Sequence, residues 1–112
     1  MEKPNDIEAE IYYLTIEEGG REGFVASGYR GQFYYDGNDW DAPQTFIGVD
    51  TVEPGEIVKA HLGFLSPQEH FGKVHTGMEF LVREGTRTVG KGRITKILDL
   101  ERSARNATNQ TT

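Results

Sequence analysis

Apolar and polar residues alternate along several short stretches of this chain, a pattern typical of β-strands with one buried face. In residues 7–13, which read Ile-Glu-Ala-Glu-Ile-Tyr-Tyr, the odd-numbered positions share an apolar face. The same alternation recurs in two later stretches and gives each an apolar face: Val58, Ala60, Leu62 and Phe64 in residues 57–64, and Met78, Phe80 and Val82 in residues 78–83. These stretches predict three half-buried strands.

Two further strands are predicted at residues 29–35, which are rich in aromatic residues, and at residues 45–49. The first is followed by Asp-Gly-Asn-Asp at residues 36–39, and residues of these types favour turns. Residues 17–23 hold three glycines among charged residues and predict an exposed loop. No stretch repeats its apolar positions with the helical period of about 3.6 residues, so we expect little helix.

Residues 80–98 predict a β-hairpin, because β-branched and apolar residues lie on both sides of a turn at Glu84-Gly85-Thr86. The second arm carries Gly90 and Gly92, and glycine inside a strand marks a bulge or a close approach of another segment. The chain holds 14 glycines and 4 prolines, which suits many short strands and turns. This pattern indicates an antiparallel sandwich or barrel and does not choose between them.

The chain of 112 residues is expected to form one domain. Residues 1–6 are a polar leader, and residues 7–98 hold all the predicted strands. Residues 99–112 have almost no apolar content and predict a frayed helical turn or a disordered tail.

Composition excludes several classes of protein and site. The chain has no cysteine, which excludes a disulfide scaffold, a cysteine-bound zinc and a thiol nucleophile. No apolar run reaches the length of a membrane span, and the first residues are too polar for a signal peptide. We therefore expect a cytoplasmic protein that does not insert into a membrane.

The net charge of −6 is unevenly distributed. Residues 1–82 hold five Lys and Arg against fifteen Asp and Glu, whereas residues 83–112 hold seven against three. One interpretation is that the basic end binds RNA or an acidic partner. The other, which we favour, is that Lys91, Arg93 and Lys96 pair with acids on neighbouring strands.

Residues 85–92, Gly-Thr-Arg-Thr-Val-Gly-Lys-Gly, approach the phosphate-binding pattern G-x-x-x-x-G-K-[ST] but fail at its last position. Gly92 has no hydroxyl for a magnesium ion, and the following residues continue as a strand instead of opening a helix. We therefore expect no nucleotide at this motif.

The histidines and acids do not form a recognisable catalytic or metal site. His61, His70 and His75 include no helical i, i+4 pair, so no structural zinc and no cofactor is expected. His61 lies on the polar face of its strand. His70 and His75 fall in an irregular loop, where with Glu69 they could meet around an adventitious metal. Because no nucleophile is spaced to meet a base, we expect no enzyme.

Three ordered motifs resemble the C-terminal domain of bacterial elongation factor Tu. Residues 83–90 read Arg-Glu-Gly-Thr-Arg-Thr-Val-Gly, where the family has Arg-Glu-Gly-Gly-Arg-Thr-Val-Gly, and residues 95–98 read Thr-Lys-Ile-Leu as in the family. Upstream, residues 17–21 read Glu-Glu-Gly-Gly-Arg, and residues 28–34 read Gly-Tyr-Arg-Gly-Gln-Phe-Tyr where the family has Gly-Tyr-Arg-Pro-Gln-Phe-Tyr. The resemblance spans residues 7–98.

The resemblance implies an all-β fold, namely a six-stranded antiparallel Greek-key-type barrel, here without a GTPase domain. It also implies a role in translation. In elongation factor Tu, this domain contacts the T-stem backbone of aminoacyl-tRNA, packs on the GTPase domain and meets the nucleotide-exchange factor. By the resemblance, the residues that contact a partner or RNA are Arg21, Arg83, Glu84, Gly85 and Arg87, and an interdomain-type surface includes Gly19, Gly20, Gln32 and Leu81.

Several departures from the family pattern favour a protein partner over RNA. The family has His where this chain has Glu22, and Arg where it has Asp36. Both changes bring negative charge toward a phosphate backbone, and RNA affinity scales with the number of phosphates neutralised. Our hypothesis is a non-catalytic, translation-related module that binds a protein. The alternative is a tRNA or other RNA-backbone binder that uses Arg21, Arg83 and Arg87.

Arg83 and Arg87 flank the predicted hairpin turn. If the turn is short, we expect the two guanidinium groups to project on the same side and form a fork suited to a carboxylate or phosphate.

Overall fold

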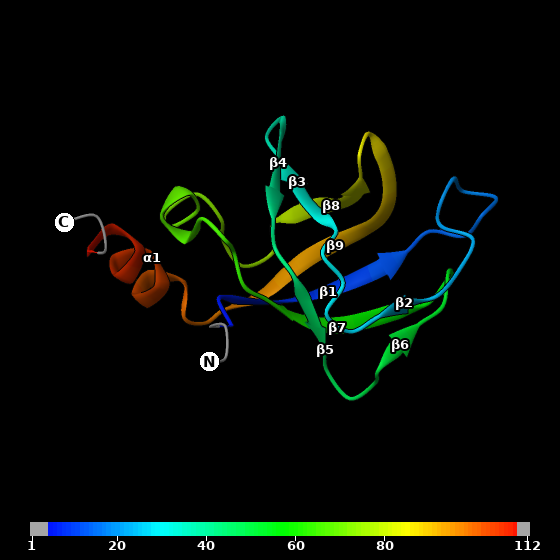
Figure 1. Cartoon of the computed structure of the whole chain (residues 1–112), viewed down its shortest axis with the longest axis horizontal. Helices are drawn as coiled ribbons and strands as arrows, with labels where there is room; N and C mark the ends of the chain where they lie inside the picture. The colour runs from blue at the N-terminus through cyan, green and yellow to red at the C-terminus, as the bar shows by residue number, and fades with distance from the viewer. Residues whose placement is uncertain (1–4, 110–112) are drawn as a thin grey trace.

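The computed structural model describes residues 5–109, in which nine strands precede one C-terminal α-helix (Figure 1). The strands are β1 (Ile7–Tyr13), β2 (Val25–Ala26), β3 (Gln32–Tyr35), β4 (Asn38–Asp41), β5 (Gln44–Phe46), β6 (Thr51–Val52), β7 (Ile57–Leu62), β8 (Glu79–Glu84) and β9 (Arg87–Ile97). A short 3-10 helix, η1 (Pro67–Glu69), lies between β7 and β8, and α1 (Leu100–Asn109) follows β9.

The main sheet is antiparallel and has the strand order β4-β3-β8-β9-β1-β7-β5, while β2 and β6 pair separately. It curls into a half-barrel (Figure 1). Its two edge strands, β4 and β5, follow each other in the chain through Ala42 and Pro43. Backbone hydrogen bonds from Leu65 to Asp41 and from Gly63 to Pro43 tie this crossing segment to the end of β7. The predicted all-β antiparallel fold is confirmed.

The predicted apolar faces form the core of the half-barrel. In β1 the residues Ile7, Ala9 and Ile11 are fully buried, and in β7 burial alternates from Val58 to Leu62. Phe33 of β3 stacks on the ring of Phe80 with centroids 4.1 Å apart. The period of the side chains in the sequence therefore identified the inner face of the central strands correctly.

Gly92 marks a close approach, as the sequence predicts. A Cβ atom at this position would overlap the ring of Phe80, which lies directly opposite on β8. Gly90 is also tight, because its Cβ would lie 3.2 Å from the Tyr12 carbonyl oxygen. The register of this hairpin shifts between Val82 and Arg83, where β9 carries Val89 as an extra residue next to Gly90, so the predicted bulge lies in the second arm. Because Gly90 and Gly92 have no side chains, β9 leaves room for the aromatic rings of the core.

The turn after β3 is shorter than the sequence predicts. Asp36 and Gly37 have φ angles of 50° and 81° and form a two-residue hairpin turn. Asn38 and Asp39, which we assigned to the turn, begin β4 instead. The strand predicted at residues 45–49 is also shorter than expected, because it corresponds to β5, which ends at Phe46. Local turn propensity gives the position of a reversal but not its length.

Residues 100–109 form a regular helix where the sequence predicts a frayed turn or a disordered tail. Leu100, Ser103 and Ala104 are buried on one side of α1. The Ser103 hydroxyl donates a hydrogen bond to a carboxylate oxygen of Asp6, a residue assigned to the polar leader. Asp6 is 1% exposed, and its other oxygen accepts the Phe64 N–H at 2.8 Å. Tertiary contacts order both ends of the described chain, and residues 1–4 and 110–112 of the leader and tail lie outside it.

Within residues 5–109, no helix has the length and apolar character needed to cross a membrane.

Candidate functional site

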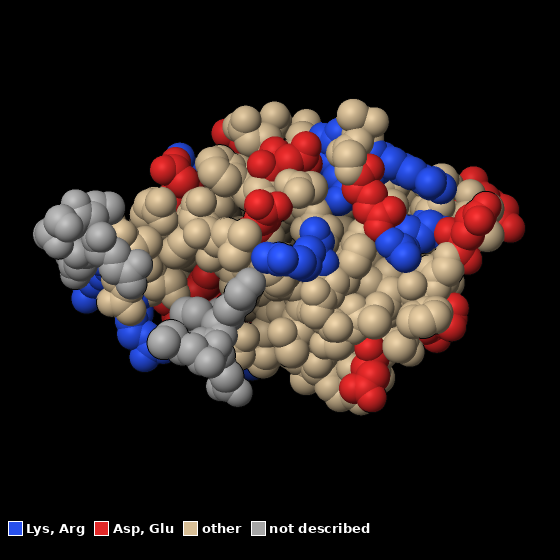
Figure 2. Space-filling view, viewed as in Figure 1, with Lys and Arg blue, Asp and Glu red and all other residues tan. Residues whose placement is uncertain are grey.

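The turn between β8 and β9 lies beside the loop that connects β1 to β2. Glu84 and Arg87 face each other across the turn, and Gly85 adopts a φ of 62° within it. Side chains from the turn reach the loop at Gly19, Gly20 and Arg21. We call these residues together the turn surface: Gly19, Gly20, Arg21, Glu84, Gly85 and Arg87. Figure 2 shows basic side chains gathered toward this end of the molecule, with acidic ones among them and at its rim.

Arg21 and Glu84 form an ion pair in the turn surface, and the Tyr29 hydroxyl donates a hydrogen bond to the same carboxylate oxygen. The Arg21 guanidinium also lies 5.4 Å from the centre of the Tyr29 ring. Burial disfavours the charge on Arg21, but the Glu84 carboxylate outweighs it and raises the pKa of Arg21. Arg21 therefore stays positively charged, and the negative charge of Glu84 largely neutralises it within the chain.

Arg87 is held by the backbone of the neighbouring loop instead of by a carboxylate. Its Nε donates to the Gly19 carbonyl at 3.0 Å, and its Nη2 donates to the Gly20 carbonyl. Gly20 is buried, and a Cβ there would overlap the backbone of Leu14, so only glycine fits. The contact fixes the loop on the turn and leaves the positive charge of Arg87 without an acidic partner among the described residues.

A depression of about 290 Å³ lies on the turn surface and is lined by Arg21, Glu22, Gly23, Glu84 and Arg87. Two exposed apolar side chains flank it in sequence: Ile16 is 56% exposed and Phe24 is 54% exposed. Guanidinium groups and turn N–H groups can bind carboxylates or phosphates, while exposed apolar side chains suit a protein surface.

Arg83 does not join Arg87 in a fork. It faces Asp39, with 3.5 Å between the charged groups, and its guanidinium lies 4.4 Å from the centre of the Tyr34 ring. In the hairpin register Arg83 pairs with Thr88, whereas Arg87 pairs with Glu84. Neighbouring positions along a strand point to opposite faces, so the two arginines diverge. The expected fork is wrong.

The residues predicted for an interdomain-type surface lie in two places. Gly19 and Gly20 belong to the turn surface. Gln32 of β3 donates a hydrogen bond to Asp41 at 2.9 Å, and Leu81 of β8 is half-buried opposite Tyr34. The structure therefore brings Arg21, Glu84, Gly85 and Arg87 together with the two glycines, and leaves Arg83, Gln32 and Leu81 on the neighbouring strands.

Two of the basic residues of β9, Arg93 and Lys96, face acids across the sheet, whereas Lys91 lies opposite Leu81 and Tyr12. Arg93 lies directly opposite Glu79 on one side and Glu10 on the other. Lys96 lies opposite Glu8, with 3.9 Å between the charged groups. This arrangement favours pairing with acids on neighbouring strands for Arg93 and Lys96, but not for Lys91.

His70 is fully buried, whereas the sequence placed it in an irregular loop with His75. Its ring stacks on Phe64 with centroids 4.0 Å apart, and Trp40 packs edge-on at 4.7 Å. The Tyr35 hydroxyl lies 2.7 Å from Nδ1, while Nε2 is buried without a hydrogen-bond partner in the described residues. Burial, followed by the charge of Lys73, lowers the pKa of His70 to about 4, so the ring is neutral at neutral pH.

Sequence reasoning missed both Tyr29 and Asp6 as members of polar networks. Tyr29 stands in the motif at residues 28–34 and Asp6 in none, and each finds its partner more than fifty residues away in the chain. His75 is exposed and His61 is half-exposed near Glu8. Within residues 5–109, no three His, Cys, Asp or Glu side chains are arranged to hold a metal ion.

The family model of the elongation factor Tu C-terminal domain matches residues 1–98. The match covers every strand and ends before α1. It includes the loop and the turn that form the turn surface, in the order in which the sequence motifs place them. The chain therefore belongs to the elongation factor Tu C-terminal domain family, whose role is in translation.

Proposed function

We propose that this chain is a cytoplasmic, non-catalytic binding module of translation, and that its turn surface contacts a protein partner. The observation that carries the proposal is the preformed contact of Arg87 with the Gly19 and Gly20 carbonyls. It fixes a loop and a turn that are distant in the sequence into one surface and leaves one positive charge available to a partner. A rigid surface of this kind needs little ordering on binding.

Charge and exposure favour a protein over RNA as the partner. Glu84 already neutralises Arg21, and the adjoining loop exposes Glu17, Glu18 and Glu22. A phosphate backbone would meet repulsion there, because RNA affinity rises with the number of phosphates neutralised. Ile16 and Phe24 supply exposed apolar side chains of the kind that become buried anchors in protein interfaces. The positive charge of Arg87 keeps RNA as the second candidate.

Binding measurements with defined probes test the proposal. Labelled chain is titrated with elongation factor Tu, with its nucleotide-exchange factor and with deacylated tRNA, at about 50 and 200 mM salt. We expect binding to one of the two proteins with a weak dependence on salt. Binding to tRNA should be confined to the lower salt concentration.

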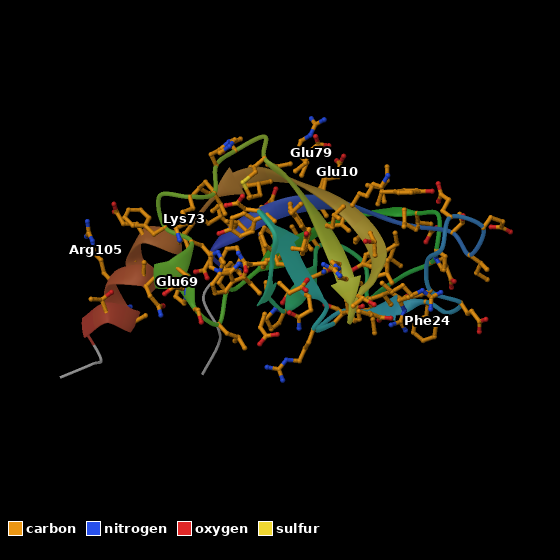
Figure 3. All side chains as sticks on the ribbon, turned by 90° about the horizontal axis from the view of Figure 1, so that it is seen from above. Glu10, Phe24, Glu69, Lys73, Glu79 and Arg105 are labelled. Carbon is orange, nitrogen blue, oxygen red and sulfur yellow. The ribbon has the colours of Figure 1, made fainter. Side chains whose placement is uncertain are left out.

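A matched pair of variants locates the surface. Phe24→Ala should weaken protein binding roughly tenfold or more, as loss of a buried anchor does. Phe71→Ala is the control, because Phe71 is 50% exposed and lies in sequence between Glu69 and Lys73, which Figure 3 shows at the end of the molecule opposite Phe24. Arg87→Glu should also weaken binding.

Binding of tRNA that persists at the higher salt concentration, is lost in Arg87→Glu and is unaffected by Phe24→Ala would establish the RNA alternative. Absence of binding to all three probes would refute a translation-related role for this surface.

A further inference from the structure

The outer face of strands β8, β9, β1 and β7 carries side chains in rows that run across the sheet. The register places Leu81, Lys91, Tyr12 and Ile57 side by side in a first row. A second row holds Glu79, Arg93, Glu10 and Lys59, and a third holds Lys96, Glu8 and His61. All of these side chains are exposed or half-exposed, because their neighbours along each strand fill the core. We call these three rows the outer face.

The second row alternates in charge across the sheet in the order acid, base, acid, base. Its members come from four successive strands and are all exposed. Figure 3 shows Glu10 and Glu79 projecting outward on the same side of the molecule. When the row is turned end to end, its order becomes base, acid, base, acid, so each acid of the original row faces a base of the reversed row and each base faces an acid. It is therefore complementary to a second copy of itself.

We propose that the outer face binds a second copy of this chain through a twofold axis that runs parallel to the strands, between β9 and β1. Such an axis reverses the order of the strands and keeps each row facing the same row. In the second row, Arg93 of one copy then meets Glu10 of the other, and Glu79 meets Lys59. A twofold interface requires this kind of self-complementary patch.

The other two rows agree with the same axis. In the first row, Lys91 of one copy meets the ring of Tyr12 in the other, which is a favourable cation–π arrangement. Lys96 meets Glu8 in the third row. A twofold axis along the rows would instead place each second-row residue against its own copy, so that like charges meet. The charges thus select one axis over the other.

Apolar side chains and hollows of the outer face fit the same arrangement. Ile57 is 64% exposed, the largest exposure among the large apolar side chains of the described residues. In the proposed dimer it meets Leu81 of the other copy, beside a hollow of about 250 Å³ lined in part by Tyr34, Phe80 and Leu81. Ile57 would lose its exposure to water there, and buried apolar anchors supply most of the binding free energy in such interfaces. This interface is separate from the turn surface.

Two charge-reversal variants test the pairing. Glu10→Lys with Glu79→Lys makes the second row uniformly positive, and Lys59→Glu with Arg93→Glu makes it uniformly negative. We expect the wild-type chain to sediment at twice the 12.6 kDa mass of one chain when its concentration is raised to about 100 μM. Each variant alone should sediment as a monomer, and an equimolar mixture of the two should restore the dimer.

A cross-linking experiment keeps the proposal testable if either charge variant fails to fold. The natural chain has no cysteine, and β9 and β1 separate residues 57 and 81 within one copy. Ile57→Cys combined with Leu81→Cys should therefore form disulfides between copies. Ile57→Cys alone and Leu81→Cys alone should not.

A wild-type chain that stays monomeric at about 100 μM overturns the proposal. So does a charge variant that dimerises alone, because the dimer then uses another surface. Failure of the folded variants to combine, or of the double-cysteine chain to cross-link, has the same consequence.

Discussion

Single residues of this protein show how burial sets chemistry. His70 lies at 0% exposure among Phe33, Tyr35, Trp40 and Phe64, and only its Nδ1 has a hydrogen-bond partner among the described residues. A charged imidazolium there would lack the solvation that water gives it. His70 is therefore a core residue that folds in its neutral form.

The neutral state of His70 predicts a pH dependence of stability. Its pKa of about 4 in the folded chain lies below the ordinary value of 6.5 expected on unfolding. The unfolded chain binds the proton first, so the free energy of unfolding falls as pH drops from 6.5 toward 4, by up to about 3 kcal/mol. Urea denaturation followed by circular dichroism across this window measures the effect.

Comparison of variants isolates the contribution of His70 from that of the carboxyl groups. Burial raises the pKa of Asp6 against the hydrogen bonds from Ser103 and Phe64, and that shift acts in the opposite sense. The wild type and the His70→Phe variant share these carboxyl groups. The difference between the two in the pH dependence of the free energy of unfolding therefore reports His70 alone. Equal slopes for wild type and His70→Phe would contradict the prediction.

Gly92→Ala should destabilise the protein by about 1–3 kcal/mol, the usual cost of overpacking a core. The added methyl would overlap the Phe80 ring, and that ring cannot retreat freely because it stacks on Phe33. Gly23→Ala is the control, since nothing lies within 4 Å of a Cβ there. If the urea midpoints of Gly92→Ala and Gly23→Ala shift by the same amount, β9 tolerates the added methyl group and the prediction is wrong.

At the scale of elements, α1 is joined to the barrel by a buried polar contact. The helix packs on η1, and Ser103 donates to the Asp6 carboxylate. The buried positions Leu100, Ser103, Ala104 and the half-buried Ala107 follow a helical period. The sequence alone does not reveal this period, because most of the buried positions of α1 hold small residues instead of large apolar ones. The period becomes visible once the segment packed against α1 is known.

Ser103→Ala should lower the free energy of unfolding by about 1–3 kcal/mol, because it leaves a buried carboxylate oxygen with one hydrogen bond fewer. The matched control is Arg105→Ala on the exposed face of α1 (Figure 3), where the pair with Glu101 is open to water and contributes little. Chemical denaturation of both variants measures the difference. If the two variants are equally stable, the contact with Asp6 does not hold the helix.

At the scale of the whole molecule, the chain separates its surfaces. The turn surface lies at one end and the contact of α1 with η1 at the other, while the outer face occupies the sheet between them (Figures 1 and 3). The half-barrel joins its two edge strands through Ala42 and Pro43, so that β4 and β5 cannot separate from each other. The half-barrel thereby holds segments that are far apart in the sequence, such as the loop between β1 and β2 and the turn between β8 and β9, in fixed contact.

The sequence by itself determined the strands with alternating side chains, the hairpin at Gly85 and the close approach at Gly92. These features depend on the side-chain period of a strand and on the backbone freedom of glycine, which are local properties. The family motifs also identified residues that meet in the turn surface. Only the tertiary structure decided which partners those residues find.

The partners of Arg21, Arg83 and Arg87 depend on the register between strands and on the loop that comes to lie beside the turn. A shift of one residue in a strand sends a side chain to the other face, so spacing in the sequence cannot fix which charges meet. The same holds for the burial of His70 and the ordering of α1. Both follow from contacts between segments far apart in the chain, and such contacts exist only after the sheet has curled into the half-barrel.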